Sequence, residues 1–200
     1  MTKHLFLVIA VLFLASFKPE GGYKVGDAVA DFKLKNVDDK MVTLSDFKDA
    51  KGYIVVFTCN HCPFSKKYED RIIALDKKYK PLGYPVIAIN PNDAAQHASD
   101  DFPSMKKRAK EKGFTFPYLY DESQAIATAY GARMTPHIFI LQAGVGTPVV
   151  KYIGAIDDNS DDATAVKEKY AENAVDALLA NKPVSPETTK AIGCTIKWKK

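Results

Sequence analysis

The feature that most constrains the fold is a pair of cysteines at the boundary between a strand-like and a helix-like segment. Residues 53–58 (YIVVFT) form a continuous apolar run rich in β-branched side chains, which predicts a buried central strand. The sequence CNHCP, from Cys59 to Pro63, follows at once. Residues 62–80 then carry apolar side chains at spacings of three and four, which predicts a helix with one buried stripe. In an α/β chain, a C-x-x-C motif at such a junction indicates a dithiol redox site.

The position of the two cysteines predicts their roles. Two cysteines three residues apart at the start of a helix can close a small disulfide. We expect Cys59 to face solvent beyond the helix end, where unpaired N–H groups and the helix dipole stabilise a thiolate. The thiolate is the attacking species in disulfide exchange. We therefore predict a Cys59–Cys62 disulfide in an oxidising compartment, with Cys59 the more exposed of the two.

His61 lies between these cysteines, and its charge bears on their chemistry. A partly protonated imidazole beside the helix start would lower the pKa of Cys59 and make the disulfide more oxidising. The alternative is a solvent-facing histidine without a role.

The rest of the chain between about residues 23 and 181 alternates strand-like and helix-like segments, which predicts one α/β domain. The expected elements are a hairpin at 31–34 and 41–44, a strand at 85–90, a helix at 104–112, a strand at 116–120, a short helix at 123–130, a hairpin at 137–141 and 149–156, and a last helix from Asp162 to 179 or 180.

Composition excludes several classes of protein. With 46% hydrophobic and 26% charged residues, the chain is neither disordered nor a multi-span membrane protein. A net charge of +4, without a basic cluster interleaved with aromatics, does not indicate nucleic-acid binding. Three cysteines are too few for a disulfide scaffold in 200 residues.

The N-terminus begins with a basic start and an apolar run, residues 5–15 (LFLVIAVLFLA). This pattern is typical of a secretory signal peptide and too short for a comfortable membrane span. We expect three parts: a signal peptide at 1–17, a domain at 23–181, and a tail at 182–200 that packs on the domain. The protein is then exported, to the periplasm, without stable membrane insertion after cleavage. The alternatives are an uncleaved anchor and a buried N-terminal element.

Thr135-Pro136 precedes the strand-like segment 137–141 and reads by itself as a loop proline, which is most often trans. Together with CNHC after a strand and the order of the later elements, it resembles the cis-proline loop of the thioredoxin fold. Residues 25–32 (VGDAVADF), the extra strand and helix at 116–130, and the sequences FTCNHCPF and GCTIKW resemble a redoxin or peroxiredoxin-like branch of that superfamily.

The resemblance implies a central mixed sheet flanked by helices, with an N-terminal hairpin and an extra strand–helix insertion. It implies that Cys59 is the nucleophile, Cys62 the resolving thiol and Pro136 the cis-proline beside them, with Thr135 and Asn60 in support. It implies an exported thiol-disulfide oxidoreductase without cofactor or bound metal. Its partners would be protein thiols and disulfides and an unidentified electron donor or acceptor.

The sequence departs from the thioredoxin pattern in two ways. Thr58 stands where thioredoxins usually have Trp, and Asn60-His61 replaces Gly-Pro. No residue clearly matches the buried acid that assists proton transfer in thioredoxins.

Two alternatives to the oxidoreductase remain open. One is a peroxiredoxin-like, antioxidant thiol peroxidase in which Cys59 is oxidised to a sulfenic acid and Cys62 closes the disulfide. The other is a metal-binding or copper-delivery module that uses Cys59, Cys62 and a histidine, for which His137 is the only candidate.

Cys194 lies in the tail, where Ile192, Cys194, Ile196 and Trp198 alternate with polar residues and predict one inward-facing apolar side. We expect Cys194 to pack there as a small apolar side chain. The alternative is a redox role, in which the tail carries a third thiol towards Cys59.

Overall fold

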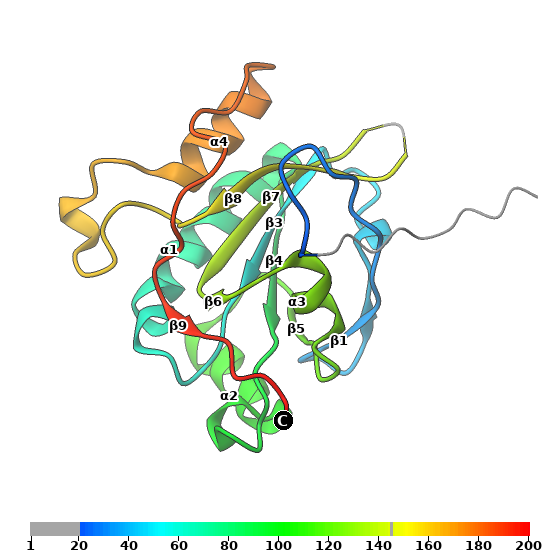
Figure 1. Ribbon diagram of the computed structural model, residues 1–200, viewed down its shortest axis with the longest axis vertical. Coiled ribbons are helices and arrows are strands. Elements are labelled where there is room, and N and C mark those ends of the chain that lie inside the picture. Colours follow the sequence, from blue (N-terminus) through cyan, green and yellow to red (C-terminus); the bar gives the residue numbers. More distant parts are fainter. Residues whose placement is uncertain (1–20, 145) are drawn as a thin grey trace, which may run out of the picture.

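A seven-stranded sheet in the order β2-β1-β5-β4-β3-β7-β8 forms the centre of the computed structural model, which describes residues 21–144 and 146–200 (Figure 1). The predicted signal peptide at 1–17 lies outside the described residues. The strands are β1 (Leu34–Asn36), β2 (Met41–Val42), β3 (Gly52–Phe57), β4 (Val86–Asn90), β5 (Tyr118–Tyr120), β7 (His137–Gln142) and β8 (Val149–Gly154).

The sheet is mixed. Strands β3, β4 and β5 run parallel, whereas β1–β2 and β7–β8 are antiparallel hairpins, and β5 and β3 each pair with one of them. The predicted fold class, with an N-terminal hairpin and an added strand and helix, is confirmed. The carboxyl ends of β3 and β4 lie at the same edge of the sheet because these strands are parallel neighbours.

Helices cover both faces of the sheet because side chains of successive strand residues point to opposite sides. Ile54 and Val56 of β3 belong to the core under α1 (Pro63–Tyr79), α2 (Phe102–Lys112) and α4 (Tyr170–Leu179). Val55 and Phe57 belong to the core on the other face, under α3 (Ala125–Tyr130) and the N-terminal segment. Short 3-10 turns occur at Leu44–Asp46, Lys80–Leu82, Ala98–Asp100 and Ala163–Ala165.

The last helix begins later than predicted. Asp162 caps the 3-10 turn Ala163–Ala165, and α4 starts at Tyr170. Residues 166–169, between this turn and α4, are not helical. Their backbone is tied to Asp158 instead, because Lys167 N–H donates to the Asp158 side chain and Asp158 N–H donates to the Glu168 carbonyl.

The tail runs along the domain to the short strand β9 (Cys194–Thr195), which pairs with β6 (Met134–Thr135) (Figure 1). Ile196 is buried, but Ile192 and Trp198 are 41% and 40% exposed. The predicted apolar alternation is therefore wrong at these two positions, because a two-residue strand orients only the side chains next to it.

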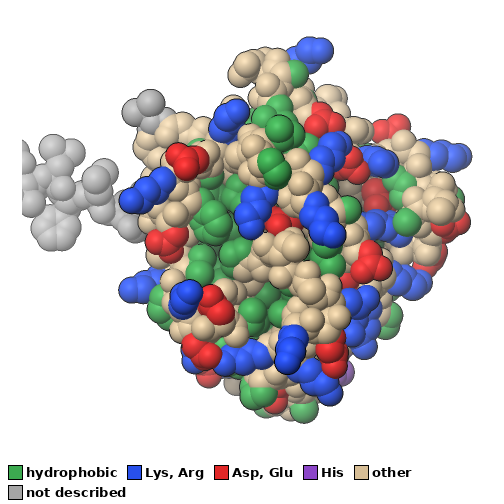
Figure 2. Space-filling view, turned by 180° about the vertical axis from the view of Figure 1, so that it is seen from behind, with side chains coloured by type: hydrophobic (Ala, Val, Ile, Leu, Met, Phe, Trp, Pro, Cys, Tyr) green, Lys and Arg blue, Asp and Glu red, His purple; other side chains and the backbone are tan. Residues whose placement is uncertain are grey.

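Among residues 21–144 and 146–200, no helix has the length and apolar character needed to cross a membrane. On the face shown in Figure 2, Lys and Arg side chains lie among Asp and Glu side chains, with hydrophobic groups in the hollows between them.

Candidate active site

The cysteines of the C-x-x-C motif lie between the end of β3 and the start of α1, at the carboxyl edge of the parallel strands. Strand β3 ends at Phe57, and α1 begins at Pro63 with Cys62 as its extended N-cap residue. Proline suits the first helical position because its missing N–H would have no partner there. Cys59 is 2% exposed and Cys62 is fully buried. The prediction that Cys59 faces solvent is wrong.

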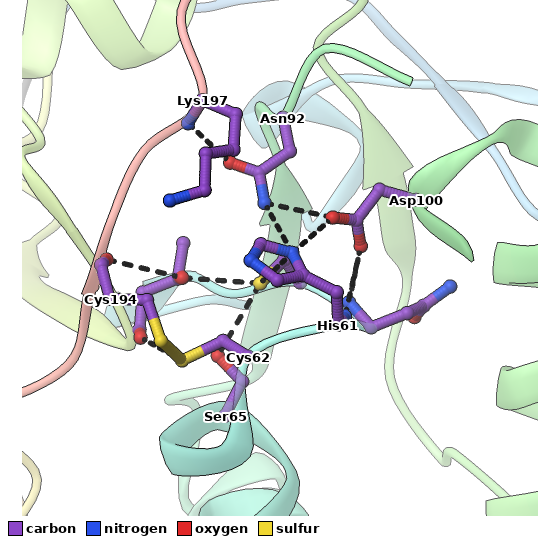
Figure 3. The surroundings of a disulfide bond; sticks show 10 residues. His61, Cys62, Ser65, Asn92, Asp100, Cys194 and Lys197 are labelled. Carbon is purple, nitrogen blue, oxygen red and sulfur yellow. Dashed lines mark hydrogen bonds and ion pairs between the residues drawn. A yellow bond between two sulfur atoms is a disulfide. The ribbon is translucent and has the colours of Figure 1, made fainter. Parts of the chain in front are cut away.

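Cys62 forms a disulfide with Cys194 (Figure 3), and Cys59 is a free thiol. The predicted Cys59–Cys62 disulfide is thus not the one in the structure. The tail explains the difference, because β9 pairs with β6 and makes Cys194 the register partner of Thr135. The Cα atoms of Cys62 and Cys194 lie 6.0 Å apart, an ordinary span for a disulfide. The interpretation of Cys194 as a packing residue alone is also wrong.

Thr135 contacts all three cysteines. Its hydroxyl oxygen lies 3.2 Å from Cys59 Sγ and 3.5 Å from the Cys194 carbonyl oxygen. Its own carbonyl oxygen lies 3.2 Å from Cys62 Sγ. The peptide bond between Thr135 and Pro136 is cis, and both residues are buried. Residues 135 and 136 therefore form one wall of the site, as the resemblance implied.

The environment of Cys59 favours the protonated thiol. Burial raises the pKa of Cys59, and the negative charge of Asp100 raises it further. Hydrogen bonds from Thr135, from the Cys62 backbone and from Ser65, whose hydroxyl lies 3.8 Å from the sulfur, act in the opposite direction. The predicted lowering of the Cys59 pKa by the helix start and His61 is wrong, because burial and a carboxylate outweigh these donors.

His61 has a closer partner than Cys59. Its Nδ1 lies 2.5 Å from Asp100 Oδ2 and 3.6 Å from Cys59 Sγ. Asp100 is fully buried, and Asn92 Nδ2 donates to the same carboxylate oxygen at 2.9 Å (Figure 3). The exposed His97 ring stacks on the His61 ring with centroids 4.0 Å apart. The imidazole is therefore fixed in place by its neighbours.

Asn60 anchors the loop that carries the thiol. Its backbone N–H donates to Asp100 Oδ1 at 2.6 Å, and its side-chain amide donates to the Ser99 carbonyl at 2.7 Å. The buried hydroxyl of Tyr118 donates to Asn60 Oδ1 at 3.0 Å. These contacts give Asn60 a positioning role beside Cys59.

The residues suggested for a metal module are not brought together. Cys62 is in a disulfide, and His137 Nδ1 accepts from the Arg133 N–H at 3.4 Å. Burial and the nearby Arg133 lower the pKa of His137 to about 4. Ligand atoms of Cys59, His61 and Asp100 do lie within 4.8 Å of one another. However, both Asp100 oxygens already accept hydrogen bonds from protein donors.

Four residues that shape the site were missed in the sequence. Asp100, Asn92 and Ser65 contact His61 or Cys59, and Gly193 contacts Thr135. A Cβ atom on Gly193 would lie 2.3 Å from the Thr135 carbonyl oxygen, so only glycine permits this approach of the tail. For Asn92 the available signal was its place in the polar loop after a predicted parallel strand, where functional side chains collect.

A free thiol lies beside a disulfide at the start of a helix, and both face a cis-proline peptide at the carboxyl edge of the sheet. This arrangement defines a thioredoxin-like redox protein. The chain belongs to the AhpC/TSA family, which matches residues 25–153. The predicted redoxin resemblance is confirmed at the level of the family.

Two relatives are named for reactions of cysteine thiols, one with disulfides and the other with peroxides. The chain is 29% identical over 145 residues to the thiol-disulfide oxidoreductase ResA of Oceanobacillus iheyensis, covering 69% of this chain and 71% of that protein. It is 30% identical over 111 residues to the chloroplastic peroxiredoxin Q of Triticum aestivum, covering 56% of this chain and 48% of that protein. These relatives support the predicted oxidoreductase class.

Solved structures agree with the fold. An uncharacterized conserved protein from Geobacillus kaustophilus is 39% identical with a TM-score of 0.81, covering 88% of this chain and 93% of that one. A protein described as a putative thiol:disulfide interchange protein DsbE from Chlorobium tepidum is 20% identical with a TM-score of 0.57, over 78% of this chain and 98% of that one. The latter likeness shows the fold alone.

Proposed function

We propose that this protein is a thiol-disulfide oxidoreductase in which Cys59 is the nucleophile and Cys62 the resolving thiol. The observation that carries the proposal is the placement of the free Cys59 thiol 3.2 Å from Thr135 Oγ1, beside the cis peptide and three residues before a cysteine already in a disulfide. Protein thiols and disulfides are the proposed partners.

The reaction starts from the form in which Cys62 has been reduced. Cys59 loses its proton to solvent, and the hydroxyls of Thr135 and Ser65 donate to the thiolate. The thiolate attacks one sulfur of a substrate disulfide, whose S–S bond breaks as the mixed disulfide forms. Cys62 thiolate then attacks Cys59 Sγ and releases the second substrate thiol. The substrate gains two electrons and two protons, and the enzyme dithiol becomes a disulfide; the reverse sequence oxidises a substrate dithiol.

A second candidate is reduction of peroxides, and the burial of Cys59 favours it. A thiol that is 2% exposed admits a peroxide more readily than a folded protein chain. Cys59 thiolate would attack one peroxide oxygen, release an alcohol or water, and become a sulfenic acid. Cys62 thiolate would then displace the sulfenic oxygen as water and close the disulfide. The peroxiredoxin relative is consistent with this chemistry.

We further propose that the protein is exported, to the periplasm, on the strength of the apolar N-terminal segment at 1–17. Cell fractionation with mass spectrometry of the mature N-terminus tests this. A chain found in the cytoplasm with residues 1–17 still attached would contradict it.

Parallel assays of insulin reduction by dithiothreitol and of peroxide consumption test the activity. Cys59→Ser should abolish whichever activity the wild-type protein has, and Thr195→Ala, an exposed neighbour of Cys194, is the matched control. Retention of both activities in Cys59→Ser would refute the role of Cys59.

A further inference from the structure

The three cysteines converge on one residue. Cys59 Sγ contacts the Thr135 hydroxyl, Cys62 Sγ contacts the Thr135 carbonyl, and Cys194 is the strand partner of Thr135. Cys62 is the middle member of this set, because it is bonded to Cys194 and its backbone hydrogen bonds to the Cys59 thiol. Cys62 is therefore adjacent to both of its possible disulfide partners.

The tail is built to present Cys194 at this place. Gly193 fits against the Thr135 carbonyl where any side chain would clash. On the other side of Cys194, Ile196 is buried and its N–H donates to the Arg133 carbonyl.

Two side chains hold the following residue of the tail. Asn92 accepts from the Lys197 N–H at 2.9 Å, and Gln124 donates to the Lys197 carbonyl at 2.8 Å. These contacts do not involve the sulfur atoms, and together with the pairing of β9 and β6 they position Cys194 beside Cys62.

We propose that Cys194 is a third redox cysteine, which removes the disulfide from the Cys59–Cys62 pair and carries it to the surface. This inference rests on the proposed function. After substrate reduction leaves a Cys59–Cys62 disulfide, the Cys194 thiolate attacks Cys62 Sγ. The Cys62–Cys194 bond forms, the Cys59–Cys62 bond breaks, and Cys59 leaves as a thiolate that takes a proton from solvent. No electrons are gained or lost in this step, and its product is the state seen in the structure.

Exposure explains why such a transfer is useful. Cys59 and Cys62 are buried, whereas Cys194 is partly exposed. The rate of thiol-disulfide exchange depends on access to the attacked sulfur. The electron donor, an external dithiol, therefore attacks Cys194 Sγ and releases Cys62 as a thiolate. Its second thiol then breaks the mixed disulfide and frees Cys194, which leaves all three cysteines reduced.

Disulfide mapping in a single turnover tests the relay. Fully reduced protein is mixed with glutathione disulfide, quenched with acid at successive times, alkylated, digested and analysed by mass spectrometry. In the wild-type protein and in Thr195→Ala, the Cys59–Cys62 disulfide should form first and give way to Cys62–Cys194 with Cys59 alkylated. In Cys194→Ser, the Cys59–Cys62 disulfide should persist. In Cys59→Ser, Cys62–Cys194 can form only by direct attack of Cys194 or Cys62 on glutathione disulfide, without a preceding Cys59–Cys62 disulfide.

Two outcomes would overturn the relay. One is a wild-type reaction that ends at Cys59–Cys62, and the other is a wild-type reaction in which Cys62–Cys194 forms without a preceding Cys59–Cys62 disulfide. In either case, loss of insulin reduction or peroxide consumption in Cys59→Ser would still support the proposed function. If both activities survive in Cys59→Ser, the proposed function itself fails.

Discussion

His61 Nδ1 lies 2.5 Å from the Asp100 carboxylate, so the histidine between the two cysteines is bound to a buried acid. A histidine placed this way cannot act simply as a cation that stabilises the Cys59 thiolate. The negative charge of Asp100 instead opposes ionisation of Cys59 and adds to the effect of burial on its pKa. The site therefore keeps its thiol protonated at neutral pH.

Asp100→Asn should lower the pKa of Cys59 by removing this charge. The oxidised protein suits the measurement because Cys59 is then the only free thiol, and its thiolate absorbance can be titrated alone. One pKa unit changes the thiolate fraction about tenfold, so alkylation of Cys59 at pH 7 should speed up by about twofold to tenfold. Asp70→Asn is the control, because it removes an exposed negative charge on α1. A Cys59 pKa that rises or stays constant in Asp100→Asn would contradict this electrostatic account.

Gly193→Ala should displace the tail, since a Cβ atom there would lie 2.3 Å from the Thr135 carbonyl oxygen. Overpacking of this kind costs about 1–3 kcal/mol in the free energy of unfolding, and formation of the Cys62–Cys194 disulfide should slow. Gly144→Ala, where nothing lies within 4 Å of the added atom, should have neither effect. Denaturant unfolding measures the change in stability, and alkylation at successive times measures the rate of disulfide formation. Equal behaviour of the two variants would mean that the tail does not depend on this contact.

Reduction should destabilise the wild-type protein because the Cys62–Cys194 disulfide links residues 132 apart in the chain. Closing a loop of this length contributes about 2–5 kcal/mol to the free energy of unfolding. Denaturant curves with and without dithiothreitol should therefore differ by that amount in the wild type and by much less in Cys194→Ser. Identical wild-type curves in both conditions would show that this disulfide adds no stability.

His137 should make the protein sensitive to mild acid. Its pKa is about 4 in the folded state, against about 6.5 in an unfolded chain, so the unfolded state binds a proton first as the pH falls. Stability is therefore lost between about pH 6.5 and 4, and the loss by pH 4.5 should be roughly 2–3 kcal/mol.

His137→Asn retains an acceptor for the Arg133 N–H and should flatten this part of the stability profile. The exposed His97 provides the control variant His97→Asn, which should keep the wild-type profile. An equally steep acid loss in His137→Asn would assign the effect to other groups.

Much of the fold followed from local pattern. The apolar run at 53–58 and the helical spacing at 62–80 predicted β3 and α1 to within one residue at each end. The C-x-x-C motif at their junction located the site.

The misses have physical causes. The disulfide between Cys62 and Cys194 depends on the pairing of β9, in the tail, with β6. These strands are far apart in the sequence, so no local sequence pattern predicts their contact. Cys59 is buried beside Thr135, which lies 76 residues further along the chain, so its burial depends on a contact that no local pattern predicts. Asp100 lies in a polar loop without periodicity, so its approach to His61 is a property of the tertiary structure.

Trapping of the substrate on Cys62→Ser tests the central claim most directly. Without Cys62, a mixed disulfide between Cys59 and a substrate thiol lacks its resolving thiol and should accumulate. After incubation with a disulfide-containing peptide and acid quenching, mass spectrometry should find the substrate attached to the tryptic peptide that contains Cys59. Attachment to Cys194 alone, with Cys59 still a free thiol, would contradict the assignment of Cys59 as the nucleophile.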